Sequence, residues 1–154
     1  MKNLRTIACC VSISLFSLAA SAQPNEIPLN EPDLKKPELF KQQPEKVALD
    51  VLHISTLLNT QVGEPVLLNL PSFRFEGTVI AAVSKYNNSI QSVVVRSTNY
   101  EGATLTVSRT SDENGNIMYT GRIISMKHGD LYQLKQEDNG LALVKNKFYS
   151  VINE

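Results

Sequence analysis

A chain of 154 residues is long enough for one domain of ordinary size and too short for two. Its 15 basic and 15 acidic side chains balance, and no cluster of Lys and Arg provides the electrostatic footprint of a nucleic-acid-binding protein. Trp is absent and aromatic residues make up 6% of the chain, so a platform that stacks sugars or bases has little to build with.

Residues 1–22 have the three parts of a secretory signal. Lys2 and Arg5 form the positive start, an apolar run follows over residues 7–19, and Ala20-Ser21-Ala22 is a small-residue cleavage pattern. The apolar run is too short for a stable membrane span. Cys9-Cys10 suggests a lipoprotein signal as the alternative, but a lipid-accepting cysteine would have to follow the apolar run. We therefore predict export to the periplasm or the extracellular space with cleavage near Ala22.

Removal of this signal changes the chemistry of the mature chain. Both cysteines leave with it, so the domain has no disulfide and depends on a packed core for stability. Two basic side chains leave as well, so 13 basic and 15 acidic ones remain, a net charge of about −2.

Residues 23–46 are predicted to form a flexible arm. Five prolines recur among Asn, Glu, Lys and Gln, remove backbone donors and disfavour helix, while apolar residues are sparse. The alternative is an extended segment that docks on a partner. A single β-rich domain is then expected over residues 47–154.

The domain alternates strand and turn signals every 8–12 residues. Ala103, Leu105 and Val107 point to one side of a strand, and Asn114-Gly115 follows as a strong hairpin signal. Asp50 is expected to cap a short helix over residues 53–58 that Gly63 ends. The predicted strands cover residues 47–51, 64–70, 73–85, 90–97, 102–108, 117–125, 131–136, 141–144 and 148–152.

This pattern predicts a mainly β fold with one short helix near its start. The antiparallel strands would form a meander or curved sheet, a sandwich or a partly open barrel. A membrane barrel is the second architecture considered, but Thr104, Thr106 and Arg122 stand where it would need lipid-facing apolar side chains.

No catalytic or metal-binding constellation is visible. His53 and His128 lie 75 positions apart without a cysteine near them, so we expect no metal and no cofactor. Ser125 precedes His128 by three residues, but no G-x-S-x-G elbow occurs, and a strand end with a turn explains the pair more simply. We therefore expect that the chain is not an enzyme.

Gly121 is unusual because it lies inside a predicted strand in the inward phase. A strand glycine marks a bulge or the close approach of another backbone. It is interpreted either as a bend that lets the sheet curl or as a contact with a partner chain. In the second case Gly121, Arg122 and Tyr132 are the predicted contact residues.

The order of these segments resembles the propeptide domain of secreted zinc metalloendopeptidases of the peptidyl-Asp type. The matching segments, spread over residues 47–153, are Leu49-Asp50-Val51, Leu57-Leu58, Val66-Leu67-Leu68-Asn69-Leu70-Pro71, Gly102-Ala103-Thr104-Leu105-Thr106-Val107-Ser108, Gly121-Arg122-Ile123-Ile124-Ser125 and Tyr132-Gln133-Leu134. The catalytic H-E-x-x-H motif does not occur in the chain, and the mature chain has no thiol that could cap a zinc ion. The resemblance thus implies a propeptide-like domain and no peptidase activity.

Three functions follow as hypotheses. In the first, the exported domain binds a secreted zinc metallopeptidase and acts as its inhibitor, folding aid or regulator. In the second it is a general binding module for a polysaccharide or a surface assembly. In the third it is the remnant pre-pro region of a zymogen. The sequence predicts no nucleic-acid partner and no membrane span, and it leaves the oligomeric state open.

Overall fold

The computed structural model describes residues 36–137, 140–148 and 150. The predicted signal over residues 1–22, with Cys9 and Cys10, and the first part of the arm, residues 23–35, lie outside the described residues. In the described ranges, no helix is long and apolar enough to cross a membrane.

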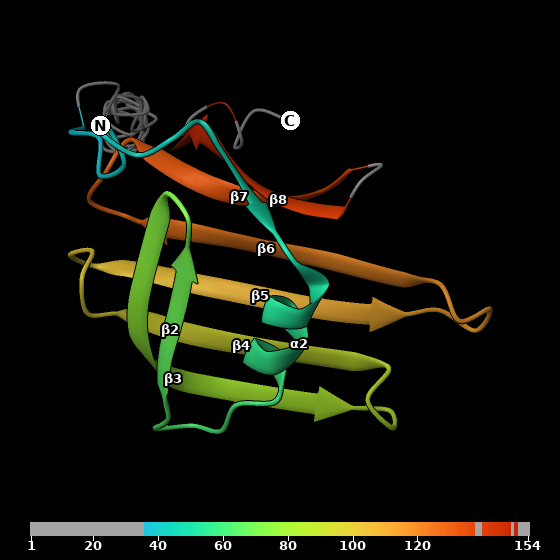
Figure 1. The fold of residues 1–154 in the computed structure, drawn as a ribbon. Coiled ribbons are helices and arrows are strands. Elements are labelled where there is room, and N and C mark those ends of the chain that lie inside the picture. The colour runs from blue at the N-terminus through green and yellow to red at the C-terminus, as the bar shows by residue number, and fades with distance from the viewer. Residues whose placement is uncertain (1–35, 138–139, 149, 151–154) are drawn as a thin grey trace, which may run out of the picture. The chain divides into compact units, whose positions relative to one another are not determined.

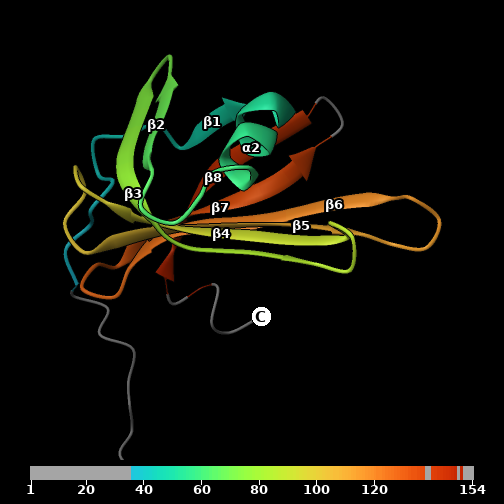
Figure 2. The ribbon, with the colours of Figure 1, turned by 90° about the horizontal axis from the view of Figure 1, so that it is seen from below.

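The described part of the chain forms one antiparallel sheet that curls round a short helix (Figures 1 and 2). The strands are β1 (Lys46–Leu49), β2 (Pro65–Leu70), β3 (Phe73–Lys85), β4 (Ile90–Ser97), β5 (Ala103–Ser111), β6 (Ile117–Ser125), β7 (Asp130–Glu137) and β8 (Gly140–Lys147), and the helix is α2 (Val51–Leu58). Their order in the sheet is β1-β8-β7-β6-β5-β4-β3-β2, so β1 and β2 are the two edges. The predicted mainly β fold is confirmed as a half-barrel of eight strands.

The strands form where the side chains alternate. Along β5, Ala103, Leu105 and Val107 are buried, while Thr104 and Thr106 on the other face are half-buried. Next to β5 in the sheet, β6 buries Ile123 in the same phase, and α2 packs on this face against β4 and β5. The apolar side of the curl is therefore the core, and the helix fills it.

The helix begins where the sequence predicts a cap. The carboxylate of Asp50 accepts a hydrogen bond from the N–H of Leu52 at 2.9 Å, which satisfies one of the free donors of the first turn. The helix then ends at Leu58 with Asn59 as its cap, and not at Gly63 as predicted. Gly63 instead turns the loop toward β2 with a φ of 93° and donates its N–H to the carbonyl of Val79.

A bulge in β3 changes the expected phase of this strand. Phe75 and Val79 are buried as predicted, but the register with β4 shifts between Val79 and Ala81. An extra residue in one strand reverses which side the following residues face. Unbroken alternation from Phe75 and Val79 predicts Val83 on the same face, but after the bulge Val83 lies on the other face and is exposed.

The last predicted strand, residues 148–152, is not observed where the structure describes it. The eighth strand extends to Lys147, and Phe148 and Ser150 have helical backbone. The remaining residues of that prediction lie outside the described ones.

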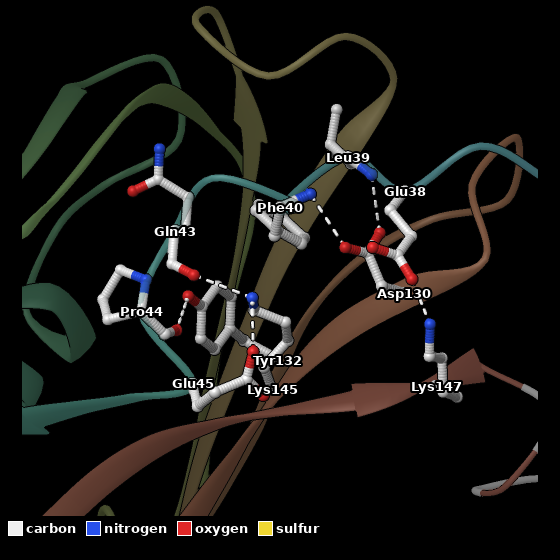
Figure 3. A network of polar contacts seen from close by, with 10 residues as sticks. All are labelled: Glu38, Leu39, Phe40, Gln43, Pro44, Glu45, Asp130, Tyr132, Lys145 and Lys147. Atoms are coloured by element: carbon white, nitrogen blue, oxygen red, sulfur yellow. Dashed lines mark hydrogen bonds and ion pairs between the residues drawn. The ribbon is translucent and has the colours of Figure 1, made fainter.

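Residues 36–45, here called the strap, are held against the sheet, although the sequence predicted them as part of a flexible arm over residues 23–46. Both carboxylate oxygens of Asp130, at the start of β7, accept backbone hydrogen bonds from the strap, from Leu39 at 2.7 Å and from Phe40 at 2.8 Å (Figure 3). The ammonium group of Lys145 donates to the carbonyl of Gln43 at 2.7 Å. The strap is therefore bound to β7 and β8 over most of its length.

One aromatic side chain of the strap completes the core. The ring of Phe40 is fully buried, and its centroid lies 4.9 Å from that of Tyr132, 5.1 Å from that of Tyr100 and 6.3 Å from that of Phe73. The low number of apolar residues in the arm did not predict this contact. A single large ring buries enough apolar surface to hold a segment against the core.

Candidate binding site at the β2 edge

The three predicted contact residues do not form one surface. Tyr132 is fully buried, and its hydroxyl donates to the carbonyl of Pro44 at 2.5 Å (Figure 3). Burial raises the pKa of Tyr132, so the hydroxyl keeps its proton for this bond. Arg122 is exposed on the opposite face of the sheet. The Tyr132 side chain consequently offers no surface to a partner.

Gly121 is a point of close approach inside the sheet. A Cβ atom at this position would lie 2.7 Å from the carbonyl oxygen of Thr106 in β5, so only glycine fits. Gly121 pairs with Val107 on one side and with Leu134 on the other. Because β6 pairs with both β5 and β7 over residues 121–124, this part of the strand has no free backbone groups for pairing with another chain.

Ser125 and His128 do come together, as a structural pair. The Nδ1 atom of His128 lies 2.8 Å from the Oγ of Ser125, whose hydroxyl also donates to the carbonyl of Glu101 at 3.3 Å. Ser125 is buried, and the Glu101 carboxylate binds Lys127 at 3.2 Å instead of orienting the histidine. The pair closes the turn between β6 and β7, with Ser125 buried and His128 half-buried.

The described residues contain no group of three His, Cys, Asp or Glu side chains that could hold a metal ion. His53 lies exposed on α2 and belongs to no such group. The described chain also offers unpaired backbone groups at the β2 edge of the sheet.

The hydrogen bonds of β3 show which backbone groups of β2 are free. Across from Leu67 in β2 lies Glu76, whose N–H donates to Asn99 and whose carbonyl accepts from the N–H of Thr98, both on the side away from β2. In an antiparallel ladder, two opposite residues either exchange both bonds or both face away from each other. The N–H and C=O of Leu67 therefore point to the outside of the sheet.

The same argument applies two residues further along. Asn69 lies opposite Arg74, and the Arg74 carbonyl accepts from the side-chain amide of Asn99 at 2.9 Å. Leu67 and Asn69 thus present two N–H donors and two carbonyl acceptors in a row. Within the described ranges no hydrogen bond satisfies these four groups.

This edge carries no charged side chain that would discourage pairing. Edge strands commonly carry charged side chains that discourage the addition of another strand. The sequence of β2, Pro-Val-Leu-Leu-Asn-Leu, has none, and its central Leu67 is 57% exposed. By contrast, the other edge strand, β1, is four residues long and begins with Lys46, which pairs with Glu137 at 2.5 Å.

Two hollows flank the β2 edge. The first, here called the β2 groove, has a volume of about 390 Å³ and is lined by Asp50, Leu52, His53, Thr56, Leu57 and Thr60 of the helical segment and by Pro65, Val66, Leu67 and Leu68. Its helical wall includes Leu52, which is 71% exposed. The second hollow, about 360 Å³, lies between Leu67, Arg74, Glu76, Thr78 and Thr98 on the other face. Leu67 lines both.

No protein family, no curated protein and no solved structure matches the chain. The resemblance to metalloendopeptidase propeptides therefore stays a prediction that rests on the sequence segments alone.

Sequence analysis located β2 as a strand but did not identify it as a binding site. The signal was present in the uncharged run over residues 65–70. Its meaning depends on β2 being an edge, and the order of strands in a sheet cannot be deduced from one strand's sequence.

Proposed function

We propose that the chain is an exported, non-catalytic domain that binds an extended segment of a partner protein by adding it to the sheet at β2. The observation that carries this proposal is the row of four unpaired backbone groups on Leu67 and Asn69, on an edge without charge. Strand addition satisfies such groups and gains affinity from main-chain hydrogen bonds, while pockets for alternate side chains add specificity.

The partner class of this proposal is a secreted zinc metallopeptidase, which the domain would inhibit, help to fold or regulate. The support is the resemblance of residues 47–153 to metalloendopeptidase propeptides and the predicted signal over residues 1–22. A domain in this role needs a rigid surface and no reactive group. The buried Ser125 hydroxyl and the firmly packed strap agree with that requirement.

The test compares two substitutions of equally exposed apolar residues. Leu67→Lys places a charge on the β2 edge, and Met118→Lys places the same charge on β6, which is separated from β2 by the strands β5, β4 and β3. Leu67 is 57% and Met118 60% exposed, so neither change removes a core contact. Each variant and the wild-type mature chain are immobilised and exposed to purified metallopeptidases secreted by the same cells.

We expect the wild type and the Met118→Lys variant to retain a metallopeptidase and to change its activity or refolding yield, and the Leu67→Lys variant to retain none. Retention by all three would show that the β2 edge is not the contact. If none retains a peptidase, the metallopeptidase role fails, and binding of a polysaccharide by the wild type would put the general binding module in its place.

A further inference from the structure

We infer that the β2 edge selects extended segments with two apolar side chains at positions i and i+2 and with a residue other than proline between them. This inference rests on the proposed strand addition and specifies its ligand. It follows from the register that the free groups of β2 impose, from the two hollows, and from the chemistry of their walls.

The free backbone groups fix which ligand residues make hydrogen bonds. An antiparallel strand added to β2 would place one residue opposite Leu67 and a second opposite Asn69, and each would exchange an N–H and a C=O with its partner. A proline at either position would lack the donor. Pro65 has no N–H itself, so at that position the ladder could add only one hydrogen bond, to the Pro65 carbonyl.

The alternation of side chains along a strand then determines on which face of the sheet each ligand side chain lies. Residues opposite Val66 and Leu68 have their side chains on the face where these two side chains are buried, which is the face of α2. The residue between them, opposite Leu67, has its side chain on the outer face, beside Arg74 and Glu76. Two ligand side chains would thus enter the β2 groove, and the one between them would stay outside.

The walls of the β2 groove are suited to aliphatic side chains. They include the exposed Leu52 and the edges of the buried Leu57 and Leu68, with Thr56 and Thr60 beside them. Burying two aliphatic groups here would also remove the exposed side chain of Leu52 from water. On the outer side, Arg74 and Glu76 form an ion pair at 2.5 Å, which favours a polar residue in the middle position.

The probe is a capped heptapeptide of sequence Lys-Thr-Val-Thr-Val-Thr-Lys, titrated into the full mature chain. With both Val side chains in the β2 groove, its central Thr lies opposite Leu67. Two analogues carry a backbone N-methyl group, one on the central Thr and one on the second Val. The N–H of the central Thr faces β2, whereas that of the Val faces solvent, so the two analogues are matched in everything except this direction.

We expect the parent peptide to bind and to move the amide resonances of Leu67 and Asn69 most. The N-methyl-Thr analogue should bind about tenfold more weakly or worse, since a hydrogen bond is lost and a methyl group blocks the approach, and the N-methyl-Val analogue should bind within about threefold of the parent. Equal effects of the two methyl groups, or no binding of the parent at millimolar concentration, would overturn the inference.

These outcomes separate the inference from the function on which it rests. If the parent peptide does not bind but Leu67→Lys abolishes retention of a metallopeptidase, the ligand rule is wrong and the function stands. If the peptides follow the expected order but no peptidase is retained, the ligand rule stands and the partner class is wrong.

Discussion

At the scale of single residues, Asp130 is the point where the strap is attached to the sheet. Its carboxylate is 1% exposed and accepts the backbone N–H groups of Leu39 and Phe40 at 2.7 and 2.8 Å. An ionised acceptor makes stronger hydrogen bonds than a neutral one, and leaving a buried donor unsatisfied is costly. Asp130 thus adds to the other contacts of the strap two hydrogen bonds from a position 90 residues away along the chain.

Asp130→Asn should loosen the strap and destabilise the domain. The amide NH₂ replaces one acceptor oxygen, so it opposes a backbone donor and at least one bond is lost. We expect the free energy of unfolding to fall by about 1–3 kcal/mol, and the peptide bonds of residues 36–45 to be cut first in brief proteolysis. The exposed Glu113→Gln is the control, and equal stability of the two variants would contradict the role of Asp130.

A second carboxylate, Asp112, orders the turn between β5 and β6. It accepts hydrogen bonds from the side-chain amide of Asn116 at 2.7 Å, from the Asn116 backbone at 2.8 Å and from the Asn114 backbone at 2.9 Å. These bonds favour the ionised form and lower the pKa of Asp112, with the Asn116 side chain as the largest cause. Their stabilising effect is therefore present above the ordinary Asp pKa and is lost as the pH falls through the lowered value.

Asn116→Ala should raise the pKa of Asp112 toward its ordinary value, because the strongest bond is removed. A titration of the Asp112 carboxyl carbon by NMR measures this directly. Asn114→Ala is the matched control, since it keeps the backbone N–H that binds Asp112, and the pKa should stay low. An unchanged titration in Asn116→Ala would show that this amide does not bind the carboxylate in solution.

At the scale of the elements, β5 holds the core because it alternates strictly and has neighbours on both sides. Leu105 is 1% exposed and lies between Val95 of β4 and Ile123 of β6, both fully buried. Thr106 is half-buried on the outer face, next to Arg122. The two faces of one strand therefore contribute very differently to stability.

Leu105→Ala should cost about 2–5 kcal/mol of unfolding free energy, because it leaves a cavity among side chains that cannot all move inward. Thr106→Ala removes a partly exposed group from the same strand and should cost less than half as much. Chemical denaturation of both variants compares the two positions in one background. Equal losses would mean that the outer face is also covered.

The strands were predictable because their signals are local. Asn114-Gly115 turns β5 into β6 as expected, with Gly115 at a φ of 82°, and Asp50 caps α2 as expected. The bulge in β3 was not predictable, since nothing in the run of residues 79–83 distinguishes an extra residue from continued alternation. Gly121 was correctly predicted to face the core side of its strand, but only the structure shows that a side chain there would meet the carbonyl oxygen of Thr106.

At the scale of the whole domain, the binding site exists because the sheet leaves β2 without a neighbour. The other edge is formed by β1, which pairs with β8 across almost a hundred residues of sequence, as Lys46 with Val144. Contacts of that separation, like those of the strap, depend on how the complete sheet curls. For this reason the sequence predicted the strands but neither the free edge nor the bound strap.

Amide hydrogen exchange along β2 tests most directly whether the outward backbone groups of this edge are free to pair with another strand. In the free chain we predict slow exchange at Val66, Leu68 and Leu70, whose amides face β3, and fast exchange at Leu67 and Asn69. In the presence of saturating peptide or of a retained metallopeptidase, the Leu67 and Asn69 amides should become protected as well. Uniform protection along β2 in the free chain, or continued fast exchange at Leu67 and Asn69 in the complex, would contradict strand addition at this edge.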